Sequence, residues 1–329
     1  MSGLEKVNDY VTGNEKADVK ELLRSSGIFG IYFTQEVVDM VQWVKGYNTG
    51  KQPQEKVKFR GMDMQNFYEI SLHILQNRTF MGNLSDKSKK DLLAFNQDVL
   101  DKKDLTTPEA QVKDLQNIAR ELKGILKSKT PVDSLEAYGL YVQLFEQMIG
   151  LQNRSMYRYS AERDIYMAEN IAYIAEHSMP GEKIIVWAHN GHISKYLLQK
   201  YEAMGMKLRK RYGDQYFALG LLVADGSARL YQLSDPNRRF KPVPLPGVAN
   251  STHIEYVFKQ AKYENFFLQI SGRKFDGPLQ DFTSQPRSIT GHGAFISNDQ
   301  RQNFQSVILD RAYDGVVFFR NTTGATEVK

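Results

Sequence analysis

The sequence predicts an α/β fold in which a mostly parallel sheet is flanked by helices and a large helical insertion lies over the cleft. Residues 64–178 carry apolar side chains at helical spacing, whereas short apolar runs bounded by turn residues follow Pro180-Gly181. A strand pattern also precedes the helical stretch, which suggests that the helices interrupt one sheet. We therefore expect a single domain over residues 1–329, with residues 64–178 as its helical insertion.

The composition is that of a globular chain with an ordinary core. Of its 329 residues 41% are hydrophobic, and 18 Tyr and 18 Phe argue against disorder. The absence of cysteine excludes a cysteine nucleophile, disulfides and Cys-ligated zinc, and it favours a cytoplasmic location. No apolar run reaches the ~18–20 residues of a membrane span, and residues 1–6 lack a signal-peptide core.

Two basic clusters, at residues 207–211 and 238–241, stand out in a chain of net charge +5. Such clusters can bind anions or nucleic acid, or they can form a solvated surface. The chain has no zinc-finger or RNP motif, so we expect the solvated surface and no nucleic-acid partner. Nucleotide-binding glycine motifs and the Gly-x-Ser-x-Gly elbow of serine hydrolases are absent as well.

Helical patterns dominate the first part of the chain. Short amphipathic helices are expected at residues 18–23 and 35–44, followed by a strand at 57–63. Within the helical block, apolar side chains at helical spacing predict helices at 67–75 and 111–126, and the polar residues 85–91 are expected to begin another helix. The proline-free stretch 135–177 is expected to form one helix or two.

The period of the pattern changes after Pro180-Gly181. Residues 183–187 form an apolar run that is typical of a strand covered on both faces. A helix is expected from Ile193 to about Ala203, and a hairpin is expected around Asp225-Gly226. The remaining pattern predicts strands at 266–270 and 315–319 and helices at 253–261 and 302–309.

The run Ala-His-Asn-Gly-His at residues 188–192 directly follows the predicted strand 183–187. Ligand sites of open α/β sheets lie at the carboxyl ends of strands. Asn190 is expected to cap the next helix, which puts His192 in its first turn, where the helix dipole favours neutral imidazole and an anionic intermediate. A neutral imidazole can act as a general base or donate a hydrogen bond to an oxyanion.

The two histidines of the run could instead be turn residues with satisfied hydrogen bonds. However, two of only six histidines fall three apart at a strand end beside Asn190, which favours function. A metal site is less favoured because no His-Glu-x-x-His motif or third ligand is found, and we expect neither metal nor cofactor. We interpret His292, between Gly291 and Gly293, as part of a loop rather than of a site.

Several segments together resemble the erythromycin esterase family, which includes succinoglycan-biosynthesis-like proteins. Residues 163–168 are similar to the family's Arg-Asp-x-x-Met-Ala helix, and residues 188–192 are similar to its Ala-His-Asn-x-His element. Residues 58–65, 216–220 and 313–319 resemble further segments of the family in the same order.

The resemblance implies metal-independent hydrolysis of a carboxylic ester or lactone of a small molecule, by histidine-assisted attack of water. His189 and His192 would be the catalytic residues that orient the substrate and stabilise the oxyanion or leaving group. Arg163, Asn190 and Glu169 would bind the substrate, although Arg163 could instead fix its helix through a salt bridge to a carboxylate.

The family's Gly-Glu-x-x-His-Gly element, which would supply the catalytic base, has no match here, and no histidine precedes Lys58. We therefore expect a chain that is N-terminally truncated relative to the family and inactive by itself. Two functions stay open: the body of an esterase-like hydrolase, or a non-catalytic binding or envelope-associated relative that keeps the fold and cleft. The pattern does not specify the substrate or the oligomeric state.

Overall fold

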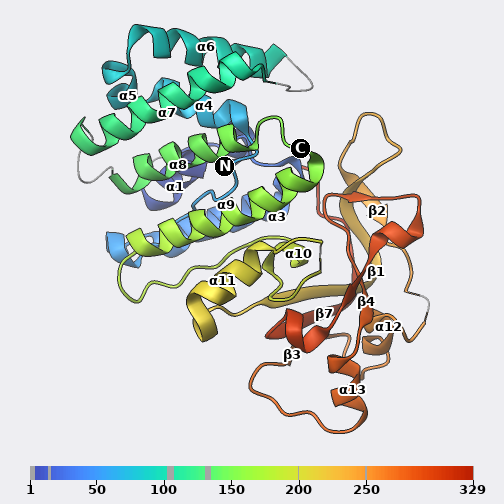
Figure 1. Ribbon diagram of the computed structural model, residues 1–329. Coiled ribbons are helices and arrows are strands. Elements are labelled where there is room, and N and C mark those ends of the chain that lie inside the picture. Colours follow the sequence, from blue (N-terminus) through green and yellow to red (C-terminus); the bar gives the residue numbers. More distant parts are fainter. Residues whose placement is uncertain are drawn as a thin grey trace. The chain divides into compact units, whose positions relative to one another are not determined.

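The computed structural model describes residues 4–13, 16–101, 107–129, 135–198, 200–248 and 250–328. The chain divides into two compact units, which Figure 1 shows in ribbon form. The first unit contains residues 1–29 and 37–184, and the second contains residues 30–36 and 185–329. Helices and a sheet build the described chain, so the expected α/β class is confirmed.

The first unit is built from helices. Their bounds are α1 (Leu4–Thr12), α2 (Val19–Ser25), α3 (Gln35–Asn48, which begins in the second unit), α4 (Phe67–Gln76), α5 (Arg78–Asn83), α6 (Asp86–Asp101), α7 (Glu109–Lys129), α8 (Leu135–Leu151) and α9 (Met156–His177), with a 3-10 turn at Pro53–Glu55. The helices predicted in this part of the chain are therefore confirmed. The proline-free stretch forms two helices because Asn153 adopts a φ of 59° and Ser155 caps α9.

Helix α8 lies at the centre of the first unit, packed against α4, α7 and α9. Its own side chains Tyr141, Phe145 and Met148 are buried, as expected for a helix whose apolar residues contact several neighbouring helices. A Cβ atom at Gly139 would collide with the Tyr173 hydroxyl of α9, so glycine permits the close approach of these two helices. No described helix is both long and apolar enough to cross a bilayer.

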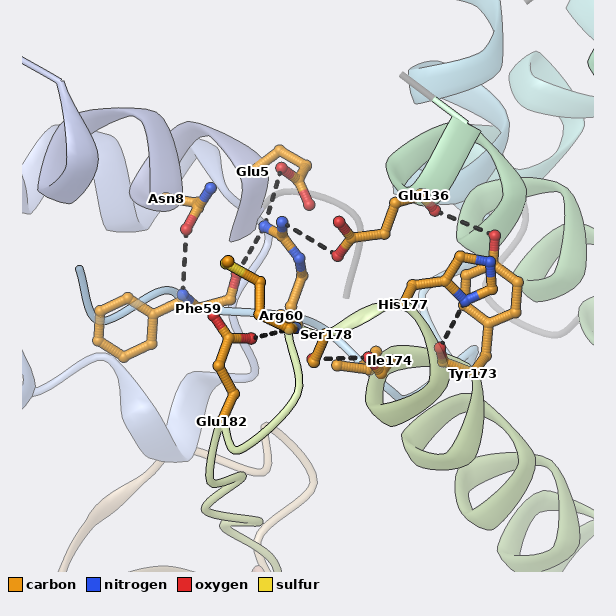
Figure 2. A network of polar contacts seen from close by, with 11 residues as sticks. Glu5, Asn8, Phe59, Arg60, Glu136, Tyr173, Ile174, His177, Ser178 and Glu182 are labelled. Carbon is orange, nitrogen blue, oxygen red and sulfur yellow. Dashed lines mark hydrogen bonds and ion pairs between the residues drawn. The ribbon is translucent and has the colours of Figure 1, made fainter. Parts of the chain in front are cut away.

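The strand predicted at residues 57–63 is wrong, because this extended segment has no neighbouring strand among the described residues. Side-chain amides pair with its backbone instead. Asn48 accepts a hydrogen bond from the Val57 N–H at 2.8 Å and donates one to the Val57 carbonyl at 2.8 Å. The Asn8 amide oxygen accepts the Phe59 N–H at 3.1 Å (Figure 2). The segment is thus held between helices by asparagines.

Arg60, next along this segment, lies between two carboxylates of the first unit (Figure 2). Its guanidinium nitrogens lie 3.5 Å from a Glu5 oxygen and 3.4 Å from a Glu136 oxygen. Burial raises the pKa of Glu5 and the Arg60 charge opposes that rise. The arginine therefore connects α1 to α8 through a half-buried ionic contact.

The second unit contains a mixed sheet. Its strands are β1 (Leu219–Gln232), β2 (Lys241–Pro244), β3 (Asn265–Gln269), β4 (Arg287–Thr290), β5 (Phe295–Ile296), β6 (Phe304–Val307) and β7 (Gly315–Thr322), and its helices are α10 (Asn190–Ile193), α11 (Met204–Tyr212), α12 (Ile254–Phe258), α13 (Pro278–Ser284) and α14 (Leu309–Ala312). The main sheet has the order β2-β1-β7-β3, with β5 paired to β1, while β4 and β6 pair separately. Because β7 and β5 run parallel to β1 but β2 and β3 pair antiparallel, a mostly parallel sheet is not confirmed.

One face of this sheet is buried and the other is exposed. Leu222, Val316 and Phe318 point into the core with the side chains of α12 and α14. On the opposite face, Leu221 and Phe267 keep 51% and 54% of their surface exposed, although both flank Val317 in register. Both faces of the sheet therefore carry apolar side chains, but the described residues of this unit cover only one of the two faces.

The predicted hairpin around Asp225-Gly226 is a single long strand. Gly226 adopts a φ of 105°, and a Cβ atom there would meet the Thr322 carbonyl of β7. The glycine therefore bends β1 without reversing it, so that β1 pairs with β7 before the bend and with β2 after it. A glycine after aspartate predicts a turn locally, but the long-range pairing with β7 decides the outcome.

Three further predictions in the second half are wrong. The helix expected from Ile193 to Ala203 does not form over the described residues that follow Ile193, where the single turn α10 ends, and residues 302–309 contain β6 instead of a helix. Residues 183–187 are extended but pair with no described strand, and Ile185 is 94% exposed. An apolar run shows only that the segment is hydrophobic. A buried strand also requires neighbouring strands that pair with its backbone and layers that cover both of its faces.

Asp314, at the start of β7, ties together several segments of the second unit. Its carboxylate lies 2.6 Å from the Lys195 ammonium and accepts the Ala218 N–H at 2.8 Å. Its backbone N–H donates to the Ala218 carbonyl, and its carbonyl accepts the N–H groups of Ile270 and Ser271. The Lys195 and Asp314 side chains are 11% and 5% exposed, so this ion pair is nearly buried.

We expect Asp314→Asn to destabilise the second unit strongly, because it leaves the Lys195 ammonium buried without its counter-ion. Breaking one partner of a buried pair costs about 3–5 kcal/mol. Urea unfolding followed by Trp187 fluorescence, in a Trp43→Phe background, reports this unit. Asp214→Asn, which breaks an exposed pair with Arg209, is the control and leaves the midpoint nearly unchanged. An unaltered midpoint for Asp314→Asn would contradict the role given to this pair.

Candidate functional site

His189 is the N-cap of the single-turn helix α10. Its Nδ1 accepts the Gly191 N–H at 3.1 Å, and its Nε2 lies 2.9 Å from the His292 carbonyl. Because a carbonyl can only accept, Nε2 carries the proton and the ring is the neutral Nε2–H tautomer. The prediction that Asn190 caps this helix is wrong, since the preceding histidine does so. Both ring nitrogens of His189 are therefore engaged by the backbone.

The pKa of His189 is lowered to about 4, first by burial and then by the neighbouring His192 and His292 rings, while the bond to the His292 carbonyl opposes the fall. The imidazole is accordingly neutral near pH 7. A helix of four residues contributes little dipole, so burial rather than the helix N-terminus accounts for this neutral state.

Asn190 binds the edge of β1. Its Nδ2 donates to the Leu221 carbonyl at 2.7 Å, and its Oδ1 accepts the Leu221 N–H at 3.0 Å. Leu221 lies opposite Val317 of β7 in a parallel ladder. The N–H and the carbonyl of Leu221 both bind Asn190, so both point away from β7. The asparagine therefore takes the place of a neighbouring strand and fixes the histidine run against the sheet.

His192 follows on the same turn. Its N–H donates to the His189 carbonyl at 2.9 Å, and the two rings are 6.3 Å apart at an interplanar angle of 78°. Tyr216 donates its hydroxyl to the Ile193 carbonyl at 2.6 Å, which holds the end of this turn. The His192 ring is thus carried on a short segment that is anchored on both sides.

His292, interpreted from the sequence as a loop residue, lies beside His189. Its carbonyl accepts the His189 Nε2–H, and the two rings interact electrostatically. The structure thus brings His189, Asn190 and His192 together with a fourth residue from a loop a hundred positions away. The pattern Gly-His-Gly gave no sign of this, because the contact depends on how β4 and β5 place the loop.

Arg163 and Glu169 lie on α9, in the first unit. Arg163 makes a bidentate contact with Asp63, with Nε and Nη2 at 3.0 and 2.7 Å from the two carboxylate oxygens. Burial raises the pKa of Asp63, but the hydrogen bond and charge of Arg163 outweigh it and hold that pKa below its usual range. This geometry agrees with the salt-bridge alternative for Arg163.

Glu169 is exposed, and the Gln147 amide lies 3.4 Å from its carboxylate. Its neighbour Asn170 is fully buried and donates to the Met62 carbonyl and to Gln147, while accepting from Gln143. Arg163 and Asn170 thus both bind the segment that contains Met62 and Asp63. Among the residues that the structure describes, no group of three or more His, Asp or Glu side chains is placed to hold a metal ion.

A family model described as erythromycin esterase matches residues 1–322. Two curated proteins are similar: "Putative hydrolase YbfO" of Bacillus subtilis (strain 168), 22% identical over all of this chain and 77% of its own length, and "Erythromycin esterase type II" of Escherichia coli, 24% identical over 76% of this chain and 73% of its own.

Three solved structures share the fold. A Bacillus cereus protein superposes with a TM-score of 0.79 at 21% identity, over 100% of this chain and 80% of that one. A succinoglycan biosynthesis protein gives 0.75 at 19% identity, over 100% and 79% of the two chains. A mutant erythromycin esterase in its open conformation gives 0.67 at 16% identity, over 98% and 81%.

We expect the second unit to lose stability as the pH falls from about 6.5 to about 4. The folded-state pKa of His189 lies below its unfolded value, so the stability it contributes is fully present above pH 6.5. It is lost between about pH 6.5 and 4, where the ring takes up a proton in the unfolded chain but not in the folded one. The loss from His189 amounts to about 3 kcal/mol. The measurement is urea unfolding followed by Trp187 fluorescence at each pH.

His189→Asn keeps an N-cap acceptor but cannot titrate, so it should flatten this pH dependence. Burial also lowers the pKa of His292, which leaves a residual slope of the same sign. His253→Asn, in the same unit but outside the histidine run, is the matched control. An identical pH profile for wild type and His189→Asn would show that His189 is not the titrating group.

Arg163→Gln is expected to destabilise the first unit, because it leaves the Asp63 carboxylate half-buried without its cation. The free energy of unfolding should fall by about 2–4 kcal/mol, which is close to the usual cost of removing one partner from a buried ion pair. Trp43 fluorescence during urea unfolding, in a Trp187→Phe background, reports this unit. Arg158→Gln on the same helix is the control, and equal midpoints for the two variants would rule out a structural role for Arg163.

Proposed function

The chain belongs to the erythromycin esterase family, and from this we propose that it hydrolyses a carboxylic ester or lactone of a small molecule. Membership supports ester-hydrolase chemistry at the level of the family. The proposal adds that the reaction is histidine-assisted, requires no metal, and uses the run at residues 188–192. It departs from the expectation of a chain that is inactive by itself, because it gives His192 the proton transfer that the resemblance assigns to the unmatched Gly-Glu-x-x-His-Gly element.

The division of roles within the run carries the proposal. Both nitrogens of His189 are engaged by the backbone, so His189 acts as a positioning residue for the turn. To His192, the second histidine of the Ala-His-Asn-x-His element, we assign the exchange of a proton with the attacking water or the departing alcohol. In that step water adds to the ester carbonyl and its proton passes to the His192 imidazole. Collapse of the tetrahedral intermediate then breaks the bond to the alkoxide, which takes that proton from the imidazolium and leaves as the alcohol.

A non-catalytic relative that binds an ester without cleaving it is the second candidate. The observation in its favour is that three polar groups of the motif serve the fold: the two nitrogens of His189 and the amide of Asn190. A relative without catalytic activity would still need these contacts to fold, so it would retain the motif although it does not cleave the ester.

We expect His192→Ala to lower kcat/KM for ester hydrolysis by about a hundredfold or more, since general acid–base groups typically contribute this much. Circular dichroism should show an unchanged fold. The assay uses p-nitrophenyl acetate, longer aryl esters and macrocyclic lactones, with His253→Ala as a control of unchanged activity. Full activity in His192→Ala would refute the role of this histidine, and binding without turnover in the wild type would favour the second candidate.

A further inference from the structure

His292 is a half-buried histidine whose ring, unlike its carbonyl, has no hydrogen-bond partner among the described residues. Neither Nδ1 nor Nε2 of its ring is exposed, and neither has a partner among the described residues. A neutral imidazole carries one N–H donor and one acceptor nitrogen. Both groups have therefore lost water without gaining a bond, an arrangement that destabilises a fold.

The loop that carries His292 is anchored at both ends, so this arrangement is not the result of a free loop. Glu255 accepts the N–H and the hydroxyl of Thr290, both at 2.7 Å, and the Gly291 N–H donates to the Asn303 carbonyl at 2.9 Å. After His292, the Ala294 carbonyl accepts the Tyr231 N–H at 3.1 Å, and the His292 carbonyl itself accepts the His189 Nε2–H. The backbone that carries the His292 ring is thus held on both sides, and the ring interacts electrostatically with His189.

A buried polar group that has no partner in the free protein can gain its hydrogen bonds from a ligand, and such preorganised groups are typical of binding sites. Such a site costs stability in the free protein and recovers it when a polar ligand atom arrives. An imidazole that remains neutral suits an uncharged ligand, because it can donate to a carbonyl or alkoxy oxygen and accept from a hydroxyl. Burial lowers the pKa of His292 in agreement with this neutral form.

We infer that His292 is a substrate-binding residue of the histidine site, and that its ring nitrogens bind uncharged oxygen groups of the ester. The identity of the ligand as an ester rests on the proposed function. His189 would then connect two ligand-facing histidines: it caps the turn that carries His192 and holds the backbone of His292.

The test is His292→Phe, which removes both nitrogens and keeps a ring of similar size. A binding role predicts that this variant unfolds at the same or a higher urea concentration than the wild type, because two unpaired buried groups are gone. It also predicts a KM for p-nitrophenyl acetate about tenfold higher, with kcat changed by less than about twofold. A lower unfolding midpoint together with an unchanged KM would overturn the inference.

His292→Gln retains a donor and an acceptor and should recover part of the lost affinity, whereas His253→Phe, outside the histidine run, should leave KM unchanged. A separate binding measurement keeps the inference distinct from the proposed activity. Acetanilide, an amide analogue that resists cleavage, is titrated into wild-type protein labelled with ¹⁵N-histidine. Saturable shifts of the His292 ring nitrogens support the inference even if no ester is hydrolysed, and their absence overturns it even if esters are hydrolysed.

Discussion

The second unit depends on the carboxylate of Asp314. Three strands begin or end near this residue, and the loop after α10 approaches it through Lys195. One oxygen neutralises the ammonium and the other accepts the Ala218 N–H, so the same side chain sets where β1 starts and where the histidine run must lie. The ammonium is nearly buried, and its removal from water is tolerated only while this partner is present. The position of the candidate site therefore depends on this ion pair together with the contacts that Asn190 makes to β1.

In both units, an asparagine side chain binds the backbone of an extended segment. Asn48 binds both backbone groups of Val57, and Asn190 binds both backbone groups of Leu221. In each case a planar amide presents the donor and acceptor that a neighbouring strand would present. The pattern explains how extended segments keep their polar groups satisfied where no strand lies beside them. It also gives Asn190 a structural reason to occupy the centre of the motif.

The helices of the first unit could be predicted from sequence because their signals are local: apolar spacing, caps such as Asp18, and breaks such as Gly27. The strands were predicted less well because a strand is defined by its partners. Residues 183–187 are as apolar as a buried strand, yet Ile185 remains 94% exposed, and the Asp225-Gly226 turn signal lies inside β1. The histidine run was identifiable from its spacing, whereas the place of His292 follows from the pairing of β1 with β5 and of β4 with β6, which no local pattern encodes.

The histidines of the second unit show why a motif does not by itself assign chemistry. His189 and His192 look equivalent in the sequence, but the first is a cap whose nitrogens are both engaged, and a proton on its Nδ1 would face the Gly191 N–H. Its neutral state is therefore required by structure and not by catalysis. His292 has the opposite character, since the backbone uses its carbonyl and leaves its ring without a bond. His189 and His292 therefore differ in which of their polar groups the fold engages, although both lie at one site, and this difference cannot be read from their residue type.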